Sequence, residues 1–228
     1  MSMFFPQLRE KATDDLLRFL AGEKKPRVPE DEMYSWLEEA AVQIASTGTK
    51  GIDSLLTLVP TADELRLRAI LVAMWVEKEN LSPSQRTNVR KIARRLLSDK
   101  RDLIVADAVD TLRRFKCRDA APAVVPLLNH LSPYVIGSAL RFIARLEPSK
   151  AVPLLVKALK SEMHIVRENA VDELEEMDYK PALAKIKPLL KDPNADVRQA
   201  ARTAVENLGE GHEKANGQLS RVGSKRVK

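Results

Sequence analysis

Four side chains are the ones best suited to metal binding or nucleophilic catalysis: His130, His164, His212 and Cys117. No histidine has a carboxylate or a cysteine at a spacing typical of metal ligands, so no metal centre is expected. The cysteine lies among the basic residues Arg114, Lys116 and Arg118, which could lower the pKa of its thiol. A reactive thiolate also requires a base or an oxyanion-stabilising partner, which the sequence does not indicate. We therefore interpret Cys117 as a packing residue between helices.

Other catalytic signatures are also missing from the sequence, which contains neither a glycine-rich phosphate loop nor a Gly-x-Ser-x-Gly motif. We therefore expect no enzymatic activity and no cofactor. The composition directs attention to helices, because 44% of the residues are hydrophobic but only 4% are aromatic. Alanine and leucine thus supply most of the apolar surface, which favours closely packed helices over a β-sandwich.

The charge of the chain is positive, but much of the excess is at one end. The formal charge is +6, and residues 209–228 hold five basic and two acidic side chains, which contribute 5−2 = +3 and leave 6−3 = +3 for the rest. A nucleic-acid-binding domain usually has a larger one-sided excess. A single cysteine suits a reducing compartment. Without a signal-peptide pattern or an apolar stretch of 18 residues, we expect a cytoplasmic monomer with no membrane contact.

An apolar pattern recurs four times in the second half of the chain. Its reference positions are Ile104, Val135, Val166 and Val197, at intervals of 135−104 = 166−135 = 197−166 = 31. Four residues after each stands an alanine: Ala108, Ala139, Ala170 and Ala201. Larger apolar residues follow at eight and eleven positions from the reference. A fixed period that preserves small and large apolar positions is typical of a helical solenoid.

Helical periodicity predicts the following segments: 7–21, 33–46, 52–59, 63–77, 83–97, 101–116, 120–130, 133–146, 149–160, 164–177, 181–191 and 194–208. The helix at 63–77 also matches the repeat, with Leu65 at the reference position. The interval to Ile104 is 104−65 = 39 residues, which is longer than 31, and the insertion is expected near Asn80–Arg86. Thr61 is predicted to begin that helix in a capping box with Glu64. Gly209 and Gly211 are expected to end the array, leaving a disordered basic tail over 209–228.

The segment 191–201, Lys-Asp-Pro-Asn-Ala-Asp-Val-Arg-Gln-Ala-Ala, resembles the core of a HEAT repeat. It is most similar to the short variety, of 31 residues in this chain, that is found in phycobilisome lyase subunits. The match recurs at 165–170 and more weakly at 64–69, so the repeats are clearest over 63–208. The resemblance implies an all-α fold, a right-handed α-α superhelix over residues 1–208 with five to six helix pairs.

The resemblance also suggests roles for particular residues. Arg66, Arg167 and Arg198 follow the reference positions and are expected to form ion pairs between neighbouring repeats, with binding of a ligand as the alternative. HEAT hydroxylases that bind iron carry His-Glu pairs at repeated positions, and no such pair occurs in this repeat frame. The pair His212–Glu213 lies in the tail, where we interpret it as a chance dipeptide. Most proteins of this kind are adaptors and scaffolds, which implies a non-catalytic protein-binding role.

In a HEAT solenoid the second helix of each pair lines the concave face. Counted from the reference position of each repeat, the residues at 0, +4, +8 and +11 form the core. Successive residues turn by 100° about the helix axis, so the residues at −1, +3, +6 and +10 face solvent. Large apolar residues and mixed charges at these positions suit a protein partner better than a phosphate backbone. The predicted partner-binding residues are Arg68, Trp75, Leu103, Asp107, Arg114, Tyr134, Arg141, Arg145, Ile165, Asp172 and Glu176. Trp75 and Tyr134 could instead pack against neighbouring helices.

Two other functions are compatible with the sequence. HEAT-like DNA glycosylases resemble this chain in fold, and basic residues cluster between Arg90 and Arg101, so a nucleic-acid-binding or DNA-repair protein is one alternative. That cluster is also what a solvated helix face would show. The other alternative is a lyase-type HEAT enzyme, or a chaperone acting on a protein-bound cofactor. A linear tetrapyrrole adduct on an acceptor protein would identify the lyase.

Overall fold

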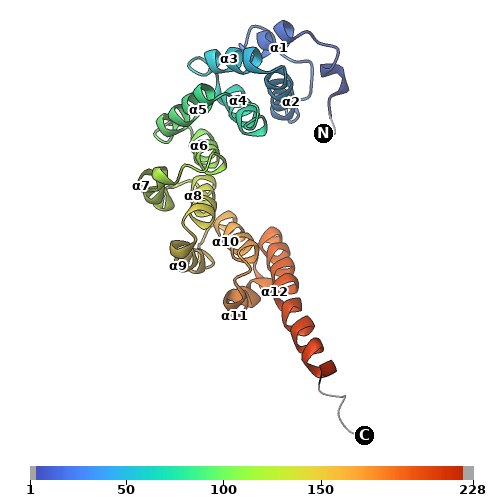
Figure 1. Cartoon of the computed structure of the whole chain (residues 1–228), viewed down its shortest axis with the longest axis vertical. Coiled ribbons are helices and arrows are strands. Elements are labelled where there is room, and N and C mark those ends of the chain that lie inside the picture. Colours follow the sequence, from blue (N-terminus) through green and yellow to red (C-terminus); the bar gives the residue numbers. More distant parts are fainter. Residues whose placement is uncertain (1–3, 223–228) are drawn as a thin grey trace. The chain divides into compact units, whose positions relative to one another are not determined.

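The computed structural model describes residues 4–222, and side chains as far as residue 209. Within these limits it consists of helices and connecting turns without a β-strand, which confirms the all-α solenoid fold (Figure 1). The described residues form two compact units that divide between Leu127 and Leu128, so a single array over 1–208 stays a prediction. None of the described helices combines the length and the apolar composition needed to cross a membrane.

The first unit stacks helices in two layers (Figure 1). One layer holds α2 (Met33–Ser46), α4 (Glu64–Val76) and α6 (Asp102–Arg114), and α4 packs against both of the others. The other layer holds α1 (Thr13–Leu20), α3 (Thr49–Leu58) and α5 (Pro83–Leu96). The 3-10 turns η1 (Pro6–Leu8) and η2 (Arg118–Ala120) and the short helix α7 (Ala121–Val124) complete the unit, and η3 (Val125–Asn129) spans the division.

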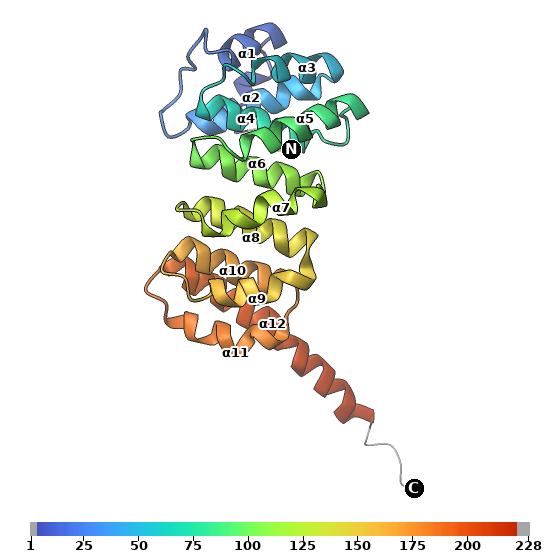
Figure 2. The same cartoon turned by 90° about the vertical axis from the view of Figure 1, so that its left-hand side faces the viewer.

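The second unit repeats this arrangement (Figure 2). Its second helices are α8 (Pro133–Leu146), α10 (His164–Glu176) and α12 (Ala195–Val222), and α10 packs against both neighbours. Its first helices are α9 (Pro148–Ala158) and the broken segment made of η4 (Lys180–Ala182), α11 (Leu183–Ile186) and η5 (Lys187–Lys191). Second helices therefore contact second helices within each unit, as the repeat pattern requires.

The repeat positions have the burial that the sequence predicted. The four alanines Ala108, Ala139, Ala170 and Ala201 are completely buried, and so are the reference residues Ile104, Val135 and Val197. Between α8 and α10, Gly137 leaves room for the Asn169 side chain, because a Cβ atom on Gly137 would lie 2.9 Å from the side-chain amide nitrogen of Asn169. Small residues therefore set the distance between consecutive second helices.

Several predicted boundaries were wrong, each for a local reason. The expected helix at 7–21 is a 3-10 turn followed by α1. The expected helices at 120–130 and 181–191 break into short pieces near Pro126 and Pro188, which cannot donate a helical hydrogen bond, whereas α9 continues through its internal Pro153. Thr61 does not cap α4; the carboxylate of Asp63 accepts the backbone N–H of Arg66 instead.

The last helix differs from its predicted end at Leu208. Helix α12 continues to Val222 through Gly209 and Gly211, which contradicts the expected stop at these glycines. A glycine within a helix costs only about 1 kcal/mol relative to alanine, and the intervening Glu210, Glu213 and Lys214 are good helix formers. Residues 223–228 lie outside the described part of the chain, and the disorder expected for the tail stays a prediction.

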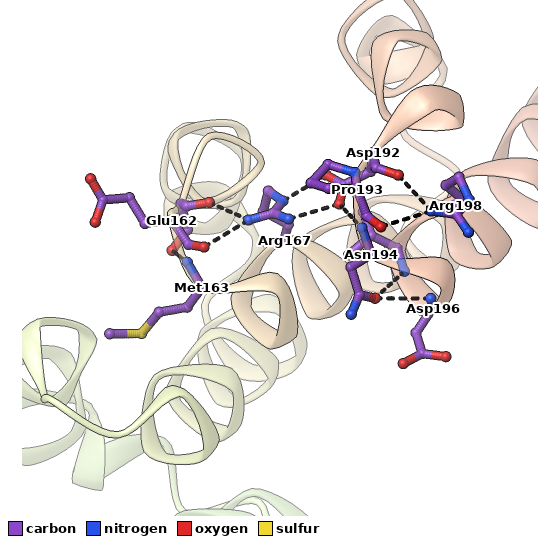
Figure 3. Close-up of polar contacts among 10 residues, drawn as sticks. Glu162, Met163, Arg167, Asp192, Pro193, Asn194, Asp196 and Arg198 are labelled. Atoms are coloured by element: carbon purple, nitrogen blue, oxygen red, sulfur yellow. Dashed lines mark hydrogen bonds and ion pairs between the residues drawn. The ribbon is translucent and has the colours of Figure 1, made fainter.

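A buried ion pair joins the last two repeats of the second unit (Figure 3). Arg167 donates from Nε and Nη2 to the two carboxylate oxygens of Asp192, at 2.8 and 2.7 Å. Its Nη1 donates to the backbone oxygens of Ser161 and Glu162, at 2.7 and 2.9 Å. This is the ion pair between repeats that was predicted for Arg167. Arg66 instead donates to the backbone oxygen of Phe19 at 2.8 Å.

Replacing Arg167 with alanine should lower the free energy of unfolding of the second unit by roughly 3 kcal/mol, because it leaves the Asp192 carboxylate buried without its partner. The guanidinium holds the pKa of Asp192 below its ordinary value, so this stabilisation is complete above about pH 4. It is lost as the pH falls through the lower folded-state pKa. Urea unfolding followed by circular dichroism at pH 7 and pH 3 measures both effects.

The control is Arg202→Ala on α12, whose arginine is exposed and bonds to Gln199 alone among the described residues. It should change the free energy of unfolding by less than about 0.5 kcal/mol. Equal losses for the two variants would contradict the assignment of Arg167 as the link between repeats.

Candidate functional site

The predicted partner-binding residues of the first unit lie on α4 and α6 and contact one another. Nε of Arg68 donates to Oδ2 of Asp107 at 2.7 Å. The same guanidinium lies 4.5 Å from the centre of the Tyr34 ring, on α2. Burial raises the pKa of Asp107 despite its arginine partner, and burial also raises the pKa of Tyr34. The ion pair of Arg68 with Asp107 thus connects α4 to α6.

A second contact between the same helices joins Trp75 and Arg114. The Cζ atom of Arg114 lies 3.7 Å from the centre of the Trp75 ring, which is cation-π distance. Arg114 is exposed and Trp75 is half-buried, as is Leu103 near the start of α6. Both alternatives considered for Trp75 hold in part, because its ring packs against the next second helix while this part of the face stays accessible to solvent.

In the second unit, the predicted residues of α8 and α10 also form cross-helix contacts. Arg145 pairs with Glu176, and its Nε lies 3.3 Å from Oε2 of the buried Glu173. Arg141 donates from Nη1 to the side-chain oxygen of Asn169 and from Nη2 to Oγ of Ser138, at 2.8 Å for the latter. The positive and negative groups that the sequence placed side by side therefore bind each other directly.

The remaining predicted residues of this unit are Tyr134, Ile165 and Asp172, which differ in exposure. The Tyr134 side chain is 51% exposed, and Ile165 is half-buried. Asp172 is accessible to solvent, yet desolvation, together with the charges of Glu168 and Glu175, raises its pKa to about 6. Nearby Arg141 offsets part of this effect. These three residues offer a partner an aromatic ring, an aliphatic edge and a titratable carboxyl group.

We call the set of eleven predicted side chains the second-helix face, with one group on α4 and α6 and another on α8 and α10. Within each group, equivalent repeat positions meet: Arg68 and Asp107 are both at +3, and Trp75 and Arg114 are both at +10. Sequence reasoning found these residues but did not pair them. It also missed Tyr34, because the repeat pattern is not recognisable in α2.

Two clefts lie elsewhere in the first unit. One, of about 330 Å³, is lined by Arg90, Lys91, Arg94 and Cys117, among others. Burial raises the pKa of the Cys117 thiol against the opposing effect of Arg90 and Arg94, so this cysteine is not activated. The other, of about 520 Å³, has Lys11, Lys24, Lys25 and Arg27 beside Phe19 and Trp36.

No metal site emerges in the described part of the chain, where no group of three or more His, Cys, Asp or Glu side chains is arranged to hold an ion. His130 accepts the backbone N–H of Ser132 at its Nδ1, at 3.1 Å. The side chain of His212 lies outside the described residues. The charged groups of the second-helix face are therefore suited to recognition by ion pairs and hydrogen bonds.

Comparison with known proteins supports the repeat assignment. Residues 121–206 match HEAT repeats, so the chain contains HEAT-like repeats. Over 106 residues it is 30% identical to the uncharacterized phycocyanin operon protein Y of Pseudanabaena tenuis (strain PCC 7409), covering 44% of this chain and only 24% of that protein. The chain thus spans about a quarter of the length of this curated relative.

Solved structures with a similar fold include the complex of CpcE and CpcF of phycocyanin lyase from Nostoc sp. PCC7120. The TM-score is 0.50 at 19% identity, covering 90% of this chain and 86% of that one. A designed armadillo repeat protein in complex with the peptide (KR)4 aligns with a TM-score of 0.47 at 20% identity, over 87% of this chain and 100% of that one. At these identities the likeness concerns the fold.

The raised pKa of Asp172 leads to a pH-dependent prediction. Between the ordinary carboxyl pKa near 4 and about 6, the unfolded chain loses this proton while the folded chain keeps it, so the stability of the second unit falls as the pH rises. The effect should stay below about 1 kcal/mol because the group is accessible to water. Carbon-13 NMR titration of the carboxyl group should give a pKa near 6.

The Asp172→Asn variant should lack this pH dependence of unfolding, because it has no proton to lose. Asp196→Asn, on α12, serves as the matched control and should keep the dependence. A titration midpoint near 4 for Asp172 would show that its surroundings are more hydrated than the structure indicates.

Proposed function

We propose that this protein is a non-catalytic scaffold that binds another protein through its second-helix face. The observation that carries the proposal is the stack of the exposed Arg114 guanidinium on the half-buried Trp75 ring. Tryptophan and arginine are enriched among residues that dominate protein–protein binding energies, together with tyrosine. The stack holds both side chains in place before binding, which lowers the entropy lost on association.

Charge patterning on this face supports a protein rather than a nucleic acid as the partner. On α8 and α10 the cations Arg141 and Arg145 alternate with the anions Asp172 and Glu176. A phosphate backbone would meet repulsion from the carboxylates, whereas a protein surface of mixed charge can complement both signs. The exposed Tyr134 adds an aromatic side chain whose hydroxyl group can reach a partner.

The test is capture of the protein's partners from its source cell by variants of the second-helix face. Arg114→Glu should lose capture because the charge that stacks on Trp75 is reversed, and Tyr134→Ala should reduce it by removing an exposed ring. Arg141 is a poorer probe, because it bonds Ser138 and Asn169 and its loss would disturb the contact of α8 with α10. Quantitative mass spectrometry of the captured proteins is the measurement.

Matched controls lie outside the face. Arg118→Glu reverses an exposed charge, and Leu131→Ala removes a side chain that is 89% exposed. Both should capture the same partners as the original chain, and all four variants should have nearly the same melting temperature. Unchanged capture by Arg114→Glu combined with Tyr134→Ala would rule out the second-helix face as the contact surface.

A second candidate function is a role in a phycocyanin lyase reaction. Two observations favour it: the relative named as a phycocyanin operon protein and the fold shared with the lyase complex of CpcE and CpcF. This role predicts a covalent linear tetrapyrrole adduct on phycocyanin when the chain is supplied with both. Absorbance and mass spectrometry of the acceptor detect that adduct, and a scaffold that only binds would leave the acceptor unmodified.

A further inference from the structure

In the last repeat of the second unit, the described residues bond to only one of the three guanidinium nitrogens of Arg198. Arg198 stands 198−167 = 31 residues after Arg167 and repeats its backbone contacts. Its Nη1 donates to the backbone oxygens of Asp192 and Pro193 at 2.8 and 2.9 Å, which matches Arg167 with Ser161 and Glu162 (Figure 3). The two guanidinium groups are therefore anchored in the same way.

The other side of each guanidinium differs. In Arg167, Nε and Nη2 bind both carboxylate oxygens of Asp192, which comes from the next repeat. Among the described residues, no acceptor bonds to Nε or Nη2 of Arg198. The sequence position that would supply a carboxylate is 192+31 = 223, and it is a glycine. With Nη1 anchored as in Arg167, Nε and Nη2 of Arg198 correspond to the two nitrogens that bind a carboxylate in Arg167.

The last repeat has cations at positions where the preceding repeat has apolar residues, on α11, η5 and α12, which pack together. Where the preceding repeat has Leu154, Val156 and Val171, the last repeat has the exposed residues Lys185, Lys187 and Arg202. A terminal repeat needs a polar outer face to stay soluble, but solubility does not require one sign of charge. All three replacements are positive. Val205 is half-buried, whereas the equivalent Leu174 is completely buried.

We infer that this end surface, made of Lys185, Lys187, Arg198 and Arg202, docks an acidic segment of a partner protein. A carboxylate of that segment occupies the fork of Arg198 as Asp192 occupies that of Arg167, and further acidic residues face the surrounding cations. The inference rests on the proposed role as a protein-binding scaffold and adds a second contact surface, distinct from the second-helix face and specific for acidic sequence.

The test measures binding of a fluorescein-labelled octapeptide of alternating aspartate and glutamate to the full chain by fluorescence anisotropy. Arg198→Ala should weaken binding about tenfold, the value of one lost charge-assisted pair of hydrogen bonds. Arg198→Lys should weaken it equally, because lysine keeps the charge but not the planar fork. The Nε–H resonance of Arg198 should shift on titration with the octapeptide.

Other variants separate this surface from alternatives. Arg118→Ala removes an exposed arginine elsewhere and should bind as the original chain does, as should Arg114→Glu and Tyr134→Ala of the second-helix face. If the second-helix face proves not to bind a partner, the expected binding of the octapeptide to the end surface is therefore unchanged. Absence of octapeptide binding, unchanged binding by Arg198→Lys, or equal displacement by inorganic phosphate at the same total charge would each overturn the inference.

Discussion

The distance between consecutive second helices is the constraint on which the rest of the structure depends. It is set where an alanine recurs every 31 residues and, between α8 and α10, where Gly137 leaves room for Asn169. A larger residue at these positions would force the helices apart and would separate every side chain that meets across the step. The pairing of Arg167 with Asp192 and of Arg68 with Asp107 both presuppose that the helices lie this close.

Because consecutive second helices lie close together, residues of the second-helix face contact one another across adjacent helices. Equivalent positions on successive second helices face each other, so complementary residue types at one repeat position produce a contact, as with Arg145 and Glu176. Such contacts order long side chains that would otherwise be mobile on a surface. A partner would meet groups whose conformations are already restricted, and part of the entropic cost of recognition is met during folding.

Much of the architecture was predictable because helical periodicity and a fixed repeat are local properties of a sequence. The alanines and reference residues predicted the buried frame, and Ser82 with Gln85 forms a capping box at the start expected for the helix after the insertion. The breaks at Pro126 and Pro188 were missed because a proline alone does not decide whether a helix ends, as the internal Pro153 of the unbroken α9 shows. The contacts between residues of the second-helix face could not be predicted, because they depend on the distance between adjacent helices, which the periodicity of a sequence does not give. Tyr34 lies outside the recognisable repeat, so no pattern could bring it to Arg68.

Among the described residues, the last helix pair of the second unit packs against another pair on one side, and its first helix is reduced to the four residues of α11 between 3-10 turns. In a linear array, each pair is held by its own hydrogen bonds and by the pairs that adjoin it. Amide protons in this terminal pair should therefore exchange with solvent through openings that leave α8 and α10 intact. Within the second unit, the last described helix pair is thus the segment expected to rearrange most readily.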